Sequence, residues 1–305
     1  MDLLRLEVLN NAFLTVTEEM SATLHRSAFS TNIKTRKDYS CALFDREGRL
    51  VAQAFAQPAH LGVLAMTVPT ATKRYGVDRL RPGDCLCVND PYCGSGHLND
   101  VCLIAPVFKD DELLAFVAST AHHVDIGGGA PGGLTLSREL YQEGFIIPPI
   151  RIVNEGRINT DLLDLFVRNI RAKQEGPGDL KAQMAANSTG IARFMELLDK
   201  YEPKTLFAYI EELIQYAKRR TLAACAELPH QEYSAEDYMD DDGFTDEPLV
   251  IRVKVTLDES GMTCDFTGTA SQRPSPVNAP VGWTYSAVSY VFKCLIGQDI
   301  PLNYG

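Results

Sequence analysis

The sequence has 305 residues, of which 45% are hydrophobic and 23% charged, an ordinary balance for a soluble globular protein. Its net charge of −11 argues against a general binder of nucleic-acid backbones, which needs a basic face. No run of about 18 apolar residues is present, and the start MDLLRLEVLNNAF lacks the features of a signal peptide. We therefore expect a cytoplasmic protein whose eight cysteines are reduced thiols, mostly in the core.

The first half of the chain predicts helices and short antiparallel strands. Apolar residues at spacings of three and four indicate an amphipathic first helix. Alternating or continuous apolar runs bounded by glycine, proline and acidic turns indicate strands, and the turns REG and KDDE close two hairpins. The expected elements are helices over 3–28 and 62–75 and strands over 40–45, 49–54, 85–90, 101–108 and 113–119.

The second half predicts a helical section followed by a third hairpin. Residues 146–158 read as extended chain, helices run from 161 to about 228 with a division near Glu202-Pro203, and a hairpin with a DESG turn covers 251–269. We expect GPGD at 176–179 to interrupt the helical section and the acidic segment 234–248 to form a surface loop. Because strands and helices do not alternate regularly, the fold class expected is α+β, with antiparallel β-hairpins and a helical middle section.

Histidines, aspartates and glycines are concentrated on either side of the second predicted hairpin, in VNDPYCGSGHLND (88–100) and AHHVDIGGG (121–129). Since the two arms are antiparallel, the start of one and the end of the other meet at one edge of the sheet. This brings His97 and Asp100 together with the His122-His123 pair. Neighbours in an extended chain point to opposite faces, so only one histidine of that pair is expected to face the site.

Two histidines with one or two carboxylates suit zinc, manganese or iron(II) and leave positions open for water. Such a cation would make hydroxide available near neutral pH, or polarise a carbonyl or phosphoryl oxygen. Surface histidines and a turn aspartate that bind nothing would give much the same pattern, so the residue types alone leave both interpretations open. Among the other histidines, His25 is expected to be structural, His60 is undecided, and His230 is given no role.

The glycine-rich segment GGGAPGG (127–133) follows the second histidine motif. Glycine permits close approach of the backbone to a ligand, which makes Gly127 and Gly128 the candidates for substrate binding. A plain mobile loop explains the composition equally well. No complete dinucleotide fingerprint, P-loop or serine-hydrolase elbow is present, so the sequence gives no sign that this chain itself binds a nucleotide.

Four segments resemble, in order, the hydantoinase B/oxoprolinase family. They are NIKTRKDYSCALFDREGRLVAQ (32–53), NDPYCGSGHLND (89–100), AFVASTAHHVDIGG (115–128) and PVNAPVGWTYSAVSYVFKCLIGQDIPLNYG (276–305). The family includes B-type subunits of ATP-dependent N-methylhydantoinases, the C-terminal half of 5-oxoprolinases, caprolactamase-type enzymes, and α-type subunits of acetone and acetophenone carboxylases.

The resemblance implies roles for individual residues. By their positions in the family motifs, His97, Asp100 and His122 would be metal ligands. Asp38 matches an aspartate that adds a further ligand in some members. His123 and Asp125 then become the candidates for catalytic proton transfer or for support of the ligands.

The resemblance also implies a partner, an A-type subunit that binds ATP and activates the substrate by phosphorylation. The expected function is the B-type role, metal-assisted ring opening of a cyclic amide of the hydantoin or 5-oxoproline type. The alternatives are a ketone carboxylase subunit and an inactive assembly module that docks through residues 161–228.

Family members normally continue well past the DIPLN-x-G motif, so the chain is expected to be an N-terminal portion. We expect a metal-site α+β region over 1–160, a helical segment over 161–230, and a β-hairpin region over 231–305 that begins a part truncated at residue 305.

Overall fold

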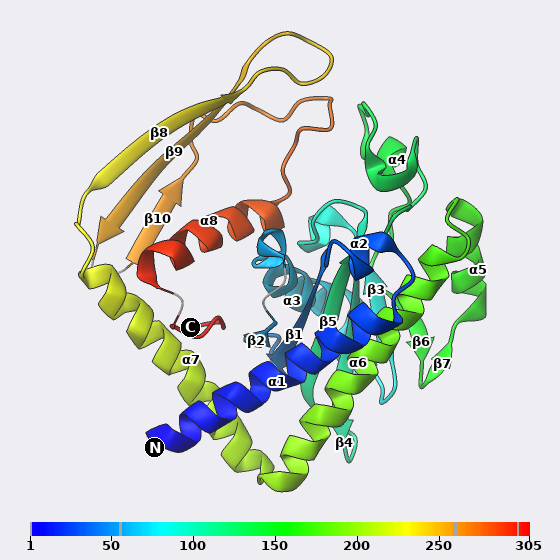
Figure 1. Ribbon diagram of the computed structural model, residues 1–305, viewed down its shortest axis with the longest axis vertical. Helices are drawn as coiled ribbons and strands as arrows, with labels where there is room; N and C mark the ends of the chain where they lie inside the picture. The colour runs from blue at the N-terminus through cyan, green and yellow to red at the C-terminus, as the bar shows by residue number, and fades with distance from the viewer. Residues whose placement is uncertain (1, 55–56, 259–260, 298) are drawn as a thin grey trace.

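The computed structural model describes residues 2–54, 57–258, 261–297 and 299–305. Figure 1 shows an α+β fold, as the sequence predicts. The described strands form a seven-stranded sheet and a separate three-stranded sheet. The helices are α1 (Leu3–Ser27), α2 (Thr31–Lys34), α3 (Val63–Tyr75), α4 (Leu140–Glu143), α5 (Thr160–Asn169), α6 (Glu175–Lys200), α7 (Pro203–Ala226) and α8 (Val281–Ile296). The strands are β1 (Tyr39–Asp45), β2 (Leu50–Gln53), β3 (Cys85–Val88), β4 (Asp100–Lys109), β5 (Glu112–His122), β6 (Ile150–Asn154), β7 (Arg157–Ile158), β8 (Glu232–Met239), β9 (Leu249–Asp258) and β10 (Gly261–Asp265).

The larger sheet has the strand order β2-β1-β5-β4-β3-β6-β7, and each neighbouring pair is antiparallel. The first two predicted hairpins are confirmed, β1–β2 and β4–β5. The arms of the second are longer than predicted, because pairing continues from Lys109↔Glu112 at the turn to Asp100↔His122 at the far end. The residues of the two histidine motifs thus end the longest paired strands of the sheet.

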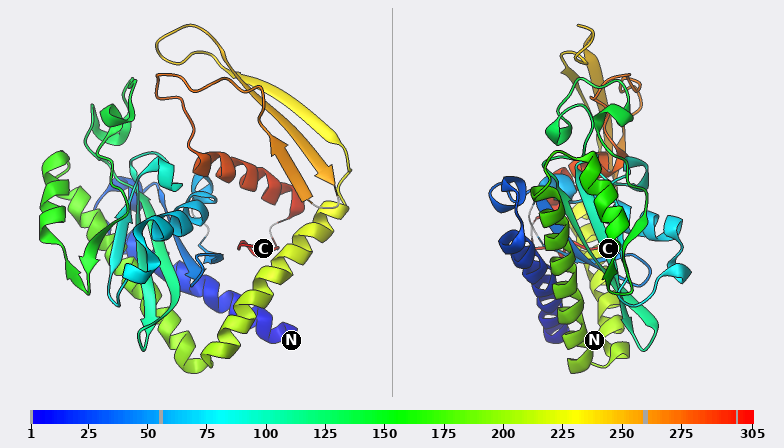
Figure 2. Two further views of the ribbon diagram at one scale, coloured as in Figure 1. Left: turned by 180° about the vertical axis from the view of Figure 1, so that it is seen from behind. Right: turned by 90° about the vertical axis from the view of Figure 1, so that its right-hand side faces the viewer.

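Helices cover both faces of this sheet, as the right-hand view of Figure 2 shows, and the residues between them and the sheet form two apolar layers. One layer contains α1 and α6 and includes Phe13, Phe194 and Val101. The other contains α3 and includes Leu64 and Cys102. Because alternate residues of a strand point to opposite faces, adjacent strand residues belong to different layers. Burial on both faces explains the nearly continuous apolar strands, and with them the buried thiols expected from the sequence.

The predicted division of the helical section near Glu202-Pro203 is confirmed, because α6 ends at Lys200 and α7 begins at Pro203, but the predicted break at 176–179 is wrong. α5 ends at Asn169, and the segment 176–179 forms the first turn of α6 instead of interrupting a helix. Proline is tolerated there because first-turn N–H groups have no partner within the helix. Gly178 is needed for close packing, since a Cβ at this position would lie 2.5 Å from the ring of Phe29.

The C-terminal region contains the smaller sheet, of order β10-β9-β8, and α8. The hairpin β9–β10 confirms the third predicted hairpin, although turn residues 259–260 lie outside the described residues. The predicted loop at 234–248 is only partly right, because β8 occupies its first part and the loop begins after Met239. β8 is exposed along its whole length. It therefore lacks the apolar alternation that identifies a half-buried strand.

α8 is rich in apolar residues, yet much of its surface is open. Its buried residues are Gly282 and Ser286, whereas Val281, Tyr285 and Leu295 are exposed. In the part of the chain that the structure describes, no helix is both long and apolar enough to span a membrane.

Candidate metal centre

Three adjacent strands bring together side chains that are far apart in the sequence. Asp100 and His122 are direct partners in the register of β4 and β5. Asp38 precedes β1, and its carbonyl oxygen accepts a hydrogen bond of 3.0 Å from the backbone N–H of His122. Side chains at opposed positions of an antiparallel pair emerge on the same face. The carboxylate of Asp100 and the ring of His122 therefore lie together at one edge of the sheet.

Two loops add histidines to this edge. His97 comes from the loop between η3 (Pro91–Cys93) and β4, and its Nδ1 accepts a hydrogen bond from the N–H of Asn99 at 3.1 Å. His60 ends η1 (Pro58–His60), and its Nδ1 is paired with the hydroxyl of Ser40 at 3.2 Å. In both rings Nδ1 is engaged, which leaves Nε2 to face the carboxylates.

The nitrogens surround the two carboxylates at distances too long for good hydrogen bonds. Ligand atoms of His97, Asp100 and His122 all lie within 4.8 Å of one another. The separations are 3.6 Å for His60 Nε2–Asp100 Oδ1, 4.0 Å for His97 Nε2–Asp100 Oδ1, 3.9 Å for His122 Nδ1–Asp100 Oδ1, 3.7 Å for His122 Nδ1–Asp38 Oδ2, and 3.8 Å for His60 Nε2–Asp38 Oδ1.

Asp100 is the most unusual member of the cluster. It is 1% exposed, and neither carboxylate oxygen has a hydrogen-bond partner among the described residues. Burial acts to raise the pKa of its carboxyl, but the imidazoles around it outweigh burial and lower the pKa. Burial and the neighbouring His97 lower the pKa of His122. An ionised carboxylate beside a neutral imidazole is the protonation state that metal binding requires.

The cluster fits a divalent cation. A buried carboxylate without a partner is costly unless another charge compensates it. The donor set of two imidazoles and two carboxylates suits zinc, manganese or iron(II). Gly96 leaves room beside this carboxylate, because a Cβ there would lie 2.3 Å from Oδ2 of Asp100.

His123 is not brought into this cluster. It points to the opposite face of the sheet, where it is fully buried, and its Nε2 is paired with the side chain of Gln183 in α6 at 2.9 Å. Its ring meets that of Phe166 edge to face. The expectation that His122 and His123 serve different faces is met, and the contacts of His123 are those of a packing residue rather than a catalytic one.

Asp125 also lies apart from the cluster, with its oxygens fully used. They accept hydrogen bonds from the backbone N–H groups of Gly127, Arg171 and Ala172, and the guanidinium of Arg171 lies 3.4 Å away. These bonds hold the glycine-rich segment to the chain just before α6. The position of Asp125 therefore gives no support for a role in proton transfer at the cluster.

Gly127 and Gly128 pack against the backbone of other segments. Both have positive φ, of 83° and 70°. A Cβ at Gly127 would lie 2.7 Å from the carbonyl oxygen of Asn169, and one at Gly128 2.6 Å from that of Gln142. Close packing and backbone conformation thus account for these glycines without a substrate.

The sequence analysis misses two residues of the site, His60 and Trp283. The local pattern assigns no role to His60, and it includes Trp283 only as part of a segment that resembles the family. Trp283, from α8, meets the ring of His97 edge to face, with centroids 5.1 Å apart. Neither position has a local signal, because each reaches the cluster only through tertiary packing.

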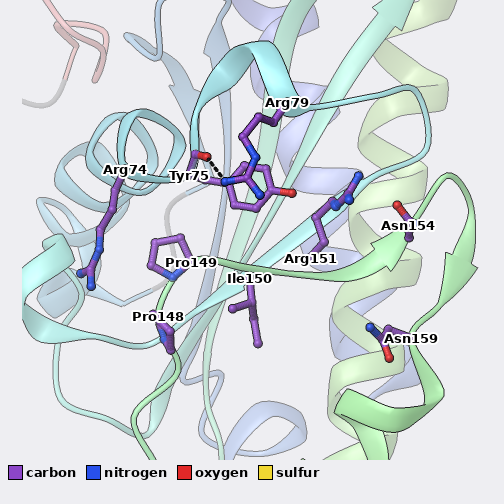
Figure 3. A pocket seen from close by; sticks show the side chains of 9 residues that line it. All are labelled: Arg74, Tyr75, Arg79, Pro148, Pro149, Ile150, Arg151, Asn154 and Asn159. Carbon is purple, nitrogen blue, oxygen red and sulfur yellow. Dashed lines mark hydrogen bonds between the residues drawn. The ribbon is translucent and has the colours of Figure 1, made fainter.

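A pocket of about 460 Å³ lies elsewhere, between the end of α3 and β6 (Figure 3). Three guanidinium groups line it, but each already has a partner. Arg74 binds Asp90 at 2.8 Å, Arg79 donates to the carbonyl of Tyr75 at 3.1 Å, and Arg151 lies 3.3 Å from Asp84. The remaining lining residues are Tyr75, Pro148, Pro149, Ile150, Asn154 and Asn159. None of the lining residues belongs to the cluster.

Comparison with known proteins agrees with the motifs around the cluster. The profile of the family described as Hydantoinase B/oxoprolinase matches residues 2–305. The chain belongs to the hydantoinase B/oxoprolinase family. The resemblance seen in the sequence is thereby confirmed across the described fold.

Individual relatives share this region but are longer. The chain is 35% identical to 5-oxoprolinase 1 of Arabidopsis thaliana, with all of this chain and 26% of the relative covered. It is 33% identical to the putative B-type subunit of a D-/L-hydantoinase from a Pseudomonas species, and the match covers 95% of this chain and 51% of that subunit. The fold matches the crystal structure of ATP-dependent caprolactamase from Pseudomonas jessenii with a TM-score of 0.90 and 30% sequence identity. The match covers 96% of this chain and 51% of the caprolactamase chain. The chain thus spans about half of these relatives' length, or less.

Proposed function

We propose that this chain supplies the metal-binding part of a B-type subunit in an ATP-dependent cyclic amidase, which opens the ring of a hydantoin- or 5-oxoproline-type substrate by hydrolysis. One observation carries the proposal: the buried carboxylate of Asp100 has no partner among the described residues and lies among imidazole nitrogens. The names of relatives that are at least 30% identical support the substrate class.

Asp38, His97, Asp100 and His122 would hold the zinc, manganese or iron(II) ion. When bound, such an ion polarises a carbonyl oxygen and lowers the pKa of water to near neutrality. Burial and the neighbouring His97 lower the pKa of His122, which favours the neutral form that can act as a ligand.

The exposure of these residues gives the cluster an open side. The side chains of Asp38, His97 and His122 are partly exposed, at 23%, 30% and 19%, whereas Asp100 and His60 are buried. A substrate would therefore approach from the side of the three partly exposed groups. Asp100 and His60 form the closed floor.

An A-type subunit that binds ATP is the partner in this proposal. Two relatives support it by name, one the B-type subunit of a hydantoinase and the other an ATP-dependent caprolactamase. The lack of a P-loop in the sequence is consistent with nucleotide binding by another chain.

The test has two stages. Inductively coupled plasma mass spectrometry of the purified chain should find about one zinc, manganese or iron ion per molecule. The metal-loaded chain is then incubated with an A-type subunit, ATP, and either 5-oxoproline or hydantoin. Ring-opened product together with ADP is expected.

Other outcomes would select the alternatives. A carboxylated product from acetone and bicarbonate, without ring opening of either cyclic amide, would favour the carboxylase. A chain that binds no metal but forms a stable complex with the A-type subunit would favour the assembly module. Either result would overturn the amidase proposal.

A further inference from the structure

The two oxygens of Asp100 face different surroundings. All three imidazole nitrogens measured to this carboxylate approach Oδ1, from His60, His97 and His122 at 3.6, 4.0 and 3.9 Å. Oδ2 instead faces Gly96, where a Cβ would lie only 2.3 Å from it. Oδ1 is thus the oxygen on the side of the cluster, and Oδ2 is turned away from it.

The indole nitrogen of Trp283 faces the same small space as Oδ2. The Cβ that Gly96 lacks would lie 2.6 Å from this nitrogen, Nε1. Nε1 is buried and, among the described residues, has no hydrogen-bond partner. A buried donor without an acceptor and a buried carboxylate oxygen without a donor therefore border the same position, which only glycine leaves open, and the structure does not yet join them. An indole N–H can only donate, and a carboxylate oxygen can only accept.

We propose that the N–H of Trp283 donates a hydrogen bond to Oδ2 of Asp100 and so turns Oδ1 toward the bound cation. Trp283 is then a positioning residue of the metal centre, and this half of the inference rests on the proposed metal-binding function. A carboxylate that binds a metal through one oxygen is held in orientation by a hydrogen bond to the other. A charge-assisted bond of this kind is also stronger than one between neutral groups.

The packing of α8 suits this role. The hydroxyl of Ser286 accepts a hydrogen bond of 2.8 Å from the N–H of Gly62, two residues after His60. Gly282 packs against the loop that carries His97, because a Cβ there would lie 2.5 Å from the carbonyl oxygen of Gly94. The start of α8 is therefore fixed to both loops that bring histidines to the cluster. Through Trp283, the C-terminal region completes a site otherwise built from the first half of the chain.

The hydrogen bond can be tested in the metal-free chain. Trp283 is the single tryptophan of the sequence, so its indole N–H gives one side-chain signal in a ¹⁵N–¹H correlation spectrum. Asp100→Ala removes the acceptor and should move the indole proton upfield. Asp38→Ala is the matched control, because it removes a cluster carboxylate that does not face Gly96, and it should leave the signal in place.

Metal affinity provides the second readout. Trp283→Phe keeps a ring against His97 but removes the N–H, and should weaken Zn²⁺ binding about 10–100-fold in competition with a chelator. Tyr290→Phe, elsewhere on α8, should bind Zn²⁺ as the wild type does. The inference is overturned if the indole signal is the same in wild type and Asp100→Ala, or if Trp283→Phe binds Zn²⁺ with wild-type affinity.

The two readouts separate this inference from the proposed function. A wild-type chain that binds no Zn²⁺ would contradict the metal centre. The indole signal of the metal-free chain would still decide whether Trp283 bonds to Asp100.

Discussion

Asp100 and Asp125 are both about 1% exposed, and they flank the same hairpin, yet their surroundings are opposite. Asp125 receives hydrogen bonds from three backbone N–H groups and lies 3.4 Å from a guanidinium. Asp100 receives none from the described residues, and faces three imidazoles beyond hydrogen-bond distance. A buried charge that its own chain satisfies holds the fold together, whereas one left unsatisfied among potential metal ligands marks a place for a cation. The difference predicts that the two regions respond differently to mutation.

The largest expected effect is on metal binding at the Asp100 side. His97→Ala or His122→Ala should abolish binding, because each removes one ligand from a small set. His123→Ala, the neighbouring histidine on the opposite face, is the matched control and should keep the metal in the folded protein. The measurement is zinc content per folded chain. Loss of zinc from His123→Ala with retention in His122→Ala would reverse the assignment of the two faces.

The next effect is on stability at the Asp125 side. Asp125→Asn replaces one acceptor oxygen with an NH₂ group that opposes backbone donors, and should cost about 2–3 kcal/mol in the free energy of unfolding. Asp100→Asn in the metal-free chain opposes no backbone donor and keeps one oxygen that can accept from Trp283, so it should cost less than about 1 kcal/mol. Urea unfolding of the two metal-free variants makes the comparison. Equal costs would show that the two carboxylates are not as different as the structure indicates.

How far the sequence predicts these two regions depends on the range of the interactions. The hairpin pattern predicts that Asp100 and His122 meet and that His122 and His123 diverge, because strand pairing and alternation are local rules. It does not predict the contacts of Asp125 with Arg171, or those of Trp283 with His97, since these depend on how separate elements pack. The sequence wrongly predicts a break at the first turn of α6. Glycine and proline there favour a turn locally, whereas the helix is completed by the packing of Gly178 against Phe29, which the local sequence does not reveal.

A smaller effect concerns pH and His60. Burial acts to lower the pKa of His60, but the carboxylates of Asp100 and Asp38 outweigh it and raise the pKa. A histidine whose pKa is raised in the folded state adds stability below its unfolded value of about 6.5, and this stability is lost as the pH rises through the folded pKa. His60→Gln in the metal-free chain should therefore cost more stability at pH 6 than at pH 9, as measured by urea unfolding. A larger cost at pH 9 would contradict the pairing of His60 with the carboxylates.

The smallest expected effect is that of a buried cysteine. Burial raises the pKa of the Cys85 thiol to about 12, so it remains protonated and is a poor metal ligand. Cys85→Ser should leave the zinc content per folded chain unchanged. If this substitution removed the metal, the ligands would be buried thiols within the sheet, and the assignment of the cluster at its edge would be wrong.

The most direct test of the account is the metal content of three purified chains, wild type, Asp100→Asn and Asp125→Asn, measured by inductively coupled plasma mass spectrometry on the folded fraction. We expect about one zinc, manganese or iron ion per chain in the wild type and in Asp125→Asn, and none in Asp100→Asn. Wild-type metal content in Asp100→Asn, or no metal in the wild type, would contradict the claim that the unsatisfied carboxylate of Asp100 marks a metal centre.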